Sequence, residues 1–393
     1  MLHLNILVSN LFLRKLLMLR KKIFGLTITL LLLSISQAVL ANHGPQIMFE
    51  KLIQRYFTAH ETKQMGTFNI DIHSYGQEIT HNLLRVDDQK YKHIFHDRFN
   101  LAALLRENDE IIFKRFHEGY GIDENTLLHG MSMSKTALAA AVGSLQCNGS
   151  IQSLDDEMGS YSKFLEKTPY SKVKIKNVLQ MNSGVTPLNG KNNKKANQIA
   201  MGMGDYSGKA DILLALKLFD KNHRIQGTEH NYHSADPFAL SVLITDITGK
   251  PASEIFYQNV YKKFSENGQI HWVSDKKGYT VSQARLVMKG PDWSNFGQFI
   301  LDEIRKNTCL GNFFENGKNS AVPTSRKNVG YGYQFWVYEI NGEKMITMTG
   351  HGGFFNILSQ SKNKVLSIFS VDEAYKAGNL FDDLESVVGE VFK

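Results

Sequence analysis

Acidic residues are absent from the first 41 positions of this 393-residue chain. The same stretch holds a basic block over residues 14–22, an apolar run over residues 23–33 and a small-residue end. That order is typical of a secretory signal, and Val39 with Ala41 predicts cleavage after Ala41. The apolar run is shorter than the roughly 20 residues that span a bilayer, so an uncleaved membrane anchor ranks second. Because residues 18–22 alone would begin a normal signal, we expect translation to start at Met18.

Excess positive charge is also scarce once this segment is set aside. Its residues include five basic and no acidic side chains, so the formal charge of +7 for the whole chain falls to +2 for the remaining 352 residues. A nearly neutral chain lacks the electrostatic footprint of a nucleic-acid-binding protein. We therefore expect an exported protein, periplasmic or secreted, that acts on small molecules and meets the membrane only through its signal peptide.

Cysteine is limited to Cys147 and Cys309. An exported protein could join them, but sequence does not show that they meet, and a core of this size needs no disulfide. No C-x-x-C or H-E-x-x-H pattern is present, and the His93/His96 and His230/His233 pairs lack a third ligand at a recognised spacing. The sequence predicts neither a metal site nor an organic cofactor.

Proline is rare, with seven residues, and no internal repeat or long linker is present, which indicates one compact unit over residues 42–393. Alternating or apolar runs predict strands over residues 67–73, 101–105 and 111–116, the last two joined by a turn at 107–110. Small apolar side chains over residues 136–145 predict a buried helix. Another helix is expected over residues 235–248, because Gly249 and Pro251 form a normal stop signal.

The C-terminal part is strand-rich again. Strands are expected over residues 331–340 and 344–349, separated by Asn341-Gly342, the strongest short hairpin signal. A second pair is expected over residues 354–359 and 365–370, and an amphipathic helix over 372–393. This order predicts an α+β fold. Its antiparallel sheet is built from residues 42–145 and 325–393 and flanked by helices, with a mainly helical region, 146–324, inserted.

Ser132-Met133-Ser134-Lys135 is the first candidate for chemistry. Residues three apart on a helix share a face, so Lys135 can reach the Ser132 hydroxyl. A lysine desolvated there can act as a base, and the Ser132 N–H can help to hold an oxyanion. The S-x-x-K pattern alone is weak, because it begins at six serines: Ser132, Ser160, Ser171, Ser274, Ser359 and Ser361. Ser132 is set apart by the alanine-rich helix that it precedes.

Several further segments follow Ser132 in an order that resembles the β-lactamase-related serine hydrolases. They are residues 149–156 (GSIQSLDD), 173–184 (VKIKNVLQMNSG), 292–297 (DWSNFG) and 331–336 (YGYQFW). That superfamily includes class C β-lactamases, D,D-peptidases of the penicillin-binding type, esterases and amide hydrolases of the aminohexanoate-dimer type. The resemblance covers most of the chain after residue 41, and it implies the β-lactamase/transpeptidase-like fold.

The resemblance also implies two further site elements. Tyr232-His233-Ser234 matches the family's Tyr-x-Asn, in which Tyr232 exchanges protons with Ser132 or the leaving group. Ser234 replaces the usual Asn and offers one smaller hydroxyl to a substrate amide, which weakens the case for β-lactam hydrolysis.

The other implied element matches the family's Lys-Thr-Gly or its His/Gly variant. His351-Gly352-Gly353 stands there, with the N–H of Phe354 as second oxyanion donor. His351 replaces a lysine, so its charge toward a substrate carboxylate would depend on pH. A plain hairpin turn at residues 350–353 is the alternative reading of this stretch.

These expectations together predict hydrolysis of an ester or amide through a Ser132 acyl-enzyme, with Lys135 and Tyr232 as proton-transfer groups. Which of the two is the general base stays open. Three alternatives remain: a class C-like β-lactamase or D,D-carboxypeptidase, an inactive binding homologue, and a structural envelope protein. No surface or repeat feature supports the last of these.

Overall fold

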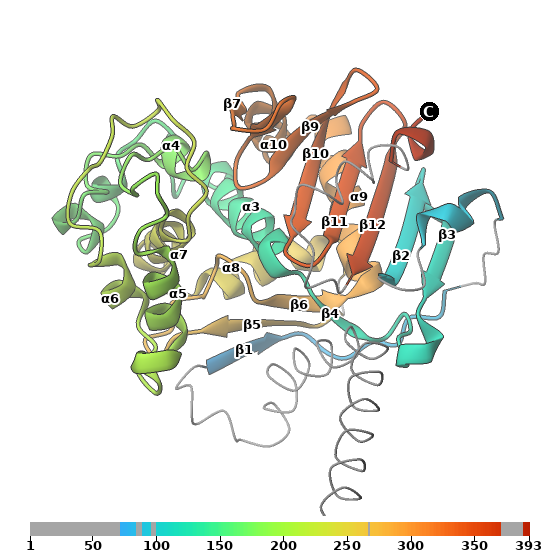
Figure 1. Ribbon diagram of the computed structural model, residues 1–393, viewed down its shortest axis with the longest axis horizontal. Helices are drawn as coiled ribbons and strands as arrows, with labels where there is room; N and C mark the ends of the chain where they lie inside the picture. The colour runs from blue at the N-terminus through green and yellow to red at the C-terminus, as the bar shows by residue number, and fades with distance from the viewer. Residues whose placement is uncertain (1–70, 84–88, 96–99, 266–267, 371–387) are drawn as a thin grey trace, which may run out of the picture. The chain divides into compact units, whose positions relative to one another are not determined.

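The computed structural model describes residues 71–83, 89–95, 100–265, 268–370 and 388–393 (Figure 1). The expected signal segment, the start at Met18, strand residues 67–70 and residues 372–387 of the expected C-terminal helix lie outside these ranges. Within them, no helix combines the length and apolar character needed to cross a bilayer.

An eight-stranded antiparallel sheet is assembled from both ends of the chain (Figure 1). Its strand order is β3-β2-β12-β11-β10-β9-β8-β7. The strands are β2 (Asn100–Glu107), β3 (Glu110–Phe116), β7 (Val322–Pro323), β8 (Val329–Tyr331), β9 (Trp336–Ile340), β10 (Glu343–Gly350), β11 (Phe354–Ser359) and β12 (Lys364–Ser370). The pairing of β12 with β2 joins the two ends and confirms the predicted α+β architecture.

Two tight turns account for the register of the predicted hairpins. Asn108 and Asp109 join β2 to β3 with φ of 49° and 72°, and Asn341 and Gly342 join β9 to β10 with φ of 52° and 78°. A two-residue turn with positive φ at both central positions matches the twist of the flanking strands, and Asn, Asp and Gly adopt it at least cost. Both hairpins were predicted from these residues.

The run over residues 331–340 is not one strand, contrary to the prediction. The chain reverses after Tyr331, and Tyr331 pairs with Trp336 across an antiparallel hairpin. Gln334 takes a positive φ of 62°, its backbone N–H donates to the Leu179 carbonyl at 2.9 Å, and its side-chain amide donates to the Val178 carbonyl at 3.0 Å. These contacts anchor the turn to the helical region, which local periodicity cannot reveal.

A second sheet was not predicted. Its four antiparallel strands run in the order β1 (Asp71–Tyr75), β5 (Ile270–Ser274), β6 (Leu286–Lys289) and β4 (Leu127–His129). Strands β5 and β6 belong to the region expected to be mainly helical. Every residue of both is buried, so they lack the polar alternation that marks a half-exposed strand.

Helix α9 (Gly290–Arg305) and the C-terminal residues cover opposite faces of the larger sheet. The helix packs against β2, β11 and β12, and Gly297 lies so close that an added Cβ would stand 2.7 Å from Val365. The alternate residues Leu366 and Ile368 instead join a buried cluster that includes Phe392. Strand β12 is therefore apolar on both faces.

The helical region surrounds α3 (Ser134–Cys147), whose residues from Ser134 to Leu145 are all buried, as predicted. It packs against α7 (Ala235–Thr248), α8 (Ala252–Asn259) and α10 (Cys309–Asn319). Helix α7 has the predicted bounds and ends at Gly249, which has a φ of 69°. The other helices are α4 (Ile175–Leu179), α5 (Asn193–Met201) and α6 (Ile212–Leu216).

A disulfide joins Cys147, the last residue of α3, to Cys309, the first residue of α10. The two cysteines are 162 positions apart in sequence and their Cα atoms are 5.7 Å apart. A cross-link of this span restricts the unfolded chain, and such bonds typically contribute about 2–4 kcal/mol to stability. The pairing that the sequence left open is therefore formed, and it fastens the helix that begins beside Ser132.

Candidate active site

Ser132 and Lys135 meet where a short 3₁₀ helix, Met131–Met133, runs into α3. The side-chain nitrogen of Lys135, Nζ, donates to Ser132 Oγ at 3.0 Å and to the backbone carbonyl of Gln283 at 2.5 Å. The Lys135 residue is only 3% exposed. The predicted i, i+3 contact is therefore present, and it lies in a buried setting where the amine has few competing water partners. The Gln283 carbonyl was missed, since it lies 148 positions away in sequence.

The turn before Ser132 is held in an uncommon conformation. Met131 has a φ of 48°, and its N–H donates to His129 Nδ1 at 2.9 Å, while its carbonyl accepts from Ser134 Oγ at 2.6 Å. Burial lowers the pKa of His129 to about 3, so the ring is neutral and its Nδ1 can accept the hydrogen bond from Met131. Gly130 is required because a Cβ there would stand 2.1 Å from the ring of Trp293. These contacts fix where Ser132 presents its hydroxyl.

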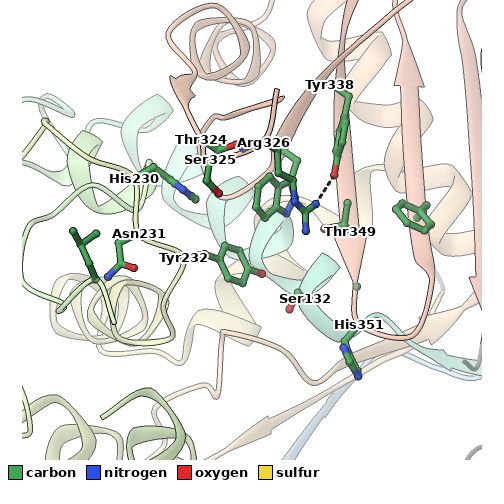
Figure 2. A pocket seen from close by; sticks show the side chains of 14 residues that line it. Ser132, His230, Asn231, Tyr232, Thr324, Ser325, Arg326, Tyr338, Thr349 and His351 are labelled. Atoms are coloured by element: carbon green, nitrogen blue, oxygen red, sulfur yellow. Dashed lines mark hydrogen bonds between the residues drawn. The ribbon is translucent and has the colours of Figure 1, made fainter. Parts of the chain in front are cut away.

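The ring of Tyr232 lies close to the Lys135 side-chain nitrogen. Lys135 Nζ is 4.9 Å from the centroid of the Tyr232 ring, and that ring stacks on Trp336 with centroids 5.3 Å apart. Tyr232 is 38% exposed, and Figure 2 shows its hydroxyl directed toward Ser132. The structure thus brings together the three side chains proposed for proton transfer and attack, from segments about 100 residues apart.

Ser234 does not share this position. It is 8% exposed, and its backbone N–H donates to Asn193 Oδ1 at 3.1 Å at the start of α7. The neighbouring cavity is lined instead by Asn231, whose side-chain amide donates to Thr186 Oγ1 at 2.6 Å. Ser234 is therefore buried at the start of α7, and its expected contact with substrate stays a prediction.

The His351-Gly352-Gly353 element forms the turn between β10 and β11, which is the alternative reading that the sequence left open. His351 lines the cavity and is exposed, whereas Gly352, Gly353 and Phe354 are buried and are not among the described lining residues. The expectation that the Phe354 N–H supplies an oxyanion donor stays a prediction.

Gly350 is the residue whose backbone borders the nucleophile. A Cβ on Gly350 would stand 2.8 Å from the Gly130 carbonyl and 2.9 Å from Met131 Cβ. Gly350 also lines the cavity together with Ser132 and His351. Gly350, the last residue of β10, therefore lies against the turn before Ser132, and His351 follows it in the cavity lining.

A cavity of about 580 Å³ opens over Ser132. Figure 2 shows its polar and aromatic walls converging on Ser132 from the loop before α7, the β7–β8 loop, β9 and the end of β10. The described lining residues are Ser132, Leu188, His230, Asn231, Tyr232, Thr324, Ser325, Arg326, Trp336, Tyr338, Thr349, Gly350, His351 and Phe355. Sequence reasoning missed Asn231 and Arg326 as residues of this lining.

His230 is neutral in this wall. Its ring centroid lies 4.8 Å from that of Tyr331, and burial, with a smaller effect of Arg224, lowers its pKa to about 4.

Among the described residues, no group of three or more His, Cys, Asp or Glu side chains could hold a metal ion.

Asp236 is a fully buried carboxyl in the first turn of α7. Its Oδ1 accepts from Tyr170 Oη at 2.7 Å and from Ser183 Oγ at 2.8 Å, whereas Oδ2 has no hydrogen-bond partner among the described residues. Burial raises the pKa of Asp236 to about 7, against its ordinary value of 3.8. The protonated form therefore stabilises the fold below pH 4, and this contribution is lost as the pH rises through 7.

The Asp236→Asn variant is expected to be more stable than the wild type at pH 8, by about 2–4 kcal/mol, and close to it at a pH of about 3.5. The amide keeps the Oδ1 acceptor and removes the buried charge. Urea unfolding at both pH values measures the difference, with the exposed Asp205→Asn as control. Equal pH dependence in wild type and Asp236→Asn would contradict the assignment.

Comparisons with known proteins identify the family and the fold. A family model described as Beta-lactamase matches residues 92–374. The fold is similar to that of a Bacillus anthracis protein assigned as a 6-aminohexanoate-dimer hydrolase, with a TM-score of 0.67, 16% identity, and coverage of 82% of this chain and 92% of that one. No curated protein sequence matches the chain.

Two further solved structures share the fold at lower similarity. A penicillin binding protein from Bacillus halodurans has a TM-score of 0.55 and 14% identity, with 74% of this chain and 96% of that one covered. EstCE1, a hydrolase with promiscuous acyltransferase activity, has a TM-score of 0.55 and 13% identity, with 74% and 94% covered. At these identities the likeness shows the fold alone.

Proposed function

Because this chain belongs to the β-lactamase family, we propose that it is a serine hydrolase that cleaves an ester or amide bond through an acyl-enzyme on Ser132. The observation that carries the proposal is the 3.0 Å contact between Lys135 Nζ and Ser132 Oγ at the base of the cavity. A buried amine beside a hydroxyl, with a tyrosine over the same amine, is an arrangement suited to moving a proton off a nucleophile.

The proposed reaction begins when Ser132 Oγ attacks the substrate carbonyl carbon and loses its proton to Lys135 or Tyr232. The oxyanion lies against the N–H of Ser132 and the backbone at Gly350 and His351, the segment that borders the nucleophile. The leaving group departs with a proton from Tyr232. Water then attacks the acyl carbon and passes a proton back through the same groups, which frees Ser132.

Ester or small-amide hydrolysis is favoured over β-lactam hydrolysis. Ser234 stands where the family has Asn, and it lies outside the described cavity wall. His351, at the turn, takes the place of a lysine. The similar folds include a protein assigned as a 6-aminohexanoate-dimer hydrolase and a hydrolase with promiscuous acyltransferase activity. They also include a penicillin binding protein, so a β-lactamase or D,D-carboxypeptidase is the second candidate.

Export is part of the same proposal. The N-terminal 41 residues have the three regions of a secretory signal, and the disulfide between Cys147 and Cys309 is of the kind that persists in oxidising compartments. A periplasmic or secreted location follows. Mass spectrometry of the N-terminal peptide, with cleavage after Ala41 expected, tests this part.

A substrate panel tests the choice between hydrolase classes. The purified protein is expected to hydrolyse 4-nitrophenyl acetate and butyrate with a kcat/KM about 100-fold or more above that for nitrocefin, since no amide side chain stands at position 234. Absorbance at the released chromophore is the measurement. A preference for nitrocefin would select the β-lactamase alternative, and failure of a fluorophosphonate to label Ser132 would favour the inactive homologue.

A further inference from the structure

The backbone that leads into Tyr232 is fixed to residues 181–186. The Asn231 N–H donates to the Met181 carbonyl at 2.7 Å, and the Asn231 side-chain amide donates to Thr186 Oγ1 at 2.6 Å. Both bonds are made by the residue directly before Tyr232, whose hydroxyl points toward the nucleophile (Figure 2). On this side, the position of Tyr232 therefore depends on where residues 181–186 lie.

A second anchor follows Tyr232 in the first turn of α7. The Asp236 carboxyl accepts from Ser183 Oγ at 2.8 Å and from Tyr170 Oη at 2.7 Å, and both bonds end on Oδ1. Ser183 belongs to residues 181–186, whereas Tyr170 does not. The Ser183–Asp236 bond therefore ties the backbone after Tyr232 to the same segment that holds the backbone before it.

The Ser183–Asp236 bond is shielded from water. Ser183 is 2% and Asp236 is 1% exposed, so no solvent competes for the bond, and removing one partner would leave the other group buried and poorly satisfied. Tyr232, in contrast, is 38% exposed. Packing restrains its side chain only in part, which gives the anchors on its backbone more weight.

We infer that the Ser183–Asp236 hydrogen bond positions Tyr232 for proton transfer, so that Ser183 and Asp236 are positioning residues of the reaction. The inference rests on the proposed function, because it concerns the proton that Tyr232 gives to the leaving group. Neither side chain is among the described lining residues of the cavity over Ser132, so both act through the backbone and not on substrate. The effect on rate is large because a shift of about 1 Å in a reacting group can cost about 100-fold.

Two acetate esters with different leaving groups test this inference. The 4-nitrophenolate ion leaves without a proton, whereas the more basic phenolate of phenyl acetate leaves faster when it receives one. Ser183→Ala is therefore expected to raise the ratio of kcat/KM values, 4-nitrophenyl acetate over phenyl acetate, roughly 10-fold. Tyr170→Phe is the matched control, since it removes the other O–H donor to the same carboxyl oxygen and should keep the wild-type ratio.

Two substitutions of Asp236 separate the hydrogen bond from the carboxyl group itself. The amide oxygen of Asp236→Asn can still accept from Ser183, so this variant should keep the wild-type ratio, whereas Asp236→Ala should raise it as Ser183→Ala does. An unchanged ratio in Ser183→Ala, or an equal rise in Tyr170→Phe, would overturn the inference and leave the hydrolase intact.

Tryptophan fluorescence gives a readout that needs no turnover. Of the three tryptophans in the chain, two are fully buried, and Trp336 is partly exposed and stacks on Tyr232. Acrylamide quenching should increase in Ser183→Ala and stay at the wild-type level in Tyr170→Phe. If no ester is hydrolysed and a fluorophosphonate does not label Ser132, the proposed function fails. The quenching then decides the positioning by itself, because an increase confined to Ser183→Ala supports it and unchanged quenching refutes it.

Discussion

The Ser132→Ala variant is expected to lose ester hydrolysis by a factor on the order of 10⁴ or more in kcat. The substitution deletes the oxygen that forms the acyl bond. It should leave the fold intact, because the neighbouring turn is held by His129, Ser134 and Gly130 and not by the Ser132 hydroxyl. Initial rates with 4-nitrophenyl acetate, together with urea unfolding of the same samples, measure both effects.

Ser160→Ala is the matched control for this variant. Ser160 begins the same S-x-x-K pattern, but it is exposed and lies outside the described cavity lining. Its replacement should leave the rate unchanged. If Ser132→Ala retained most of the wild-type rate, or if Ser160→Ala lost as much, the nucleophile would have been misassigned.

The Lys135→Met variant is expected to lose on the order of 10³-fold in kcat/KM, the middle of the range for removal of a general acid or base. Methionine fills a similar volume and removes a buried amine that now bonds to Ser132 Oγ and to the Gln283 carbonyl. Replacing a buried charged group by an apolar one of similar size is often close to neutral for stability. The loss should therefore appear in the rate and not in the unfolding midpoint.

Lys163→Met provides the comparison, since Lys163 is the exposed lysine of the Ser160 pattern. Stopped-flow measurement of the first turnover separates acylation from release of the acyl group. Loss of acylation would identify Lys135 as the group that activates Ser132, whereas loss of acyl release alone would give the first proton transfer to Tyr232. Full activity in Lys135→Met would contradict a role for the lysine.

Local signals in the sequence predicted much of the fold. Asn341-Gly342 favours a tight turn with positive φ at both positions, and the structure has such a turn at these two residues. Gly249 ended α7 as expected. Strands β5 and β6 were missed because their partners β1 and β4 lie far away in sequence, and because burial on both faces removes the alternation.

The part of the candidate site that could be predicted is the pair of residues that helical spacing brings together. Ser132 and Lys135 are three residues apart, so their contact follows from helical periodicity. Arg326 carried no local signal, since its place in the cavity depends on Trp336 and Tyr338 from the adjacent strand. The second oxyanion donor, expected at Phe354 from the resemblance, stays a prediction, because a motif match does not show which backbone N–H faces the nucleophile. Gly350 was not singled out in the sequence, although the structure places it against the turn before Ser132.

Intact-protein mass spectrometry tests the central claim most directly. Wild-type protein mixed with 4-nitrophenyl butyrate and quenched in acid within the first turnovers should gain the mass of one butyryl group. Peptide mapping should place that group on Ser132, and Ser132→Ala should gain no mass. Hydrolysis without any adduct in the wild type, or an adduct on another residue, would contradict an acyl-enzyme on Ser132.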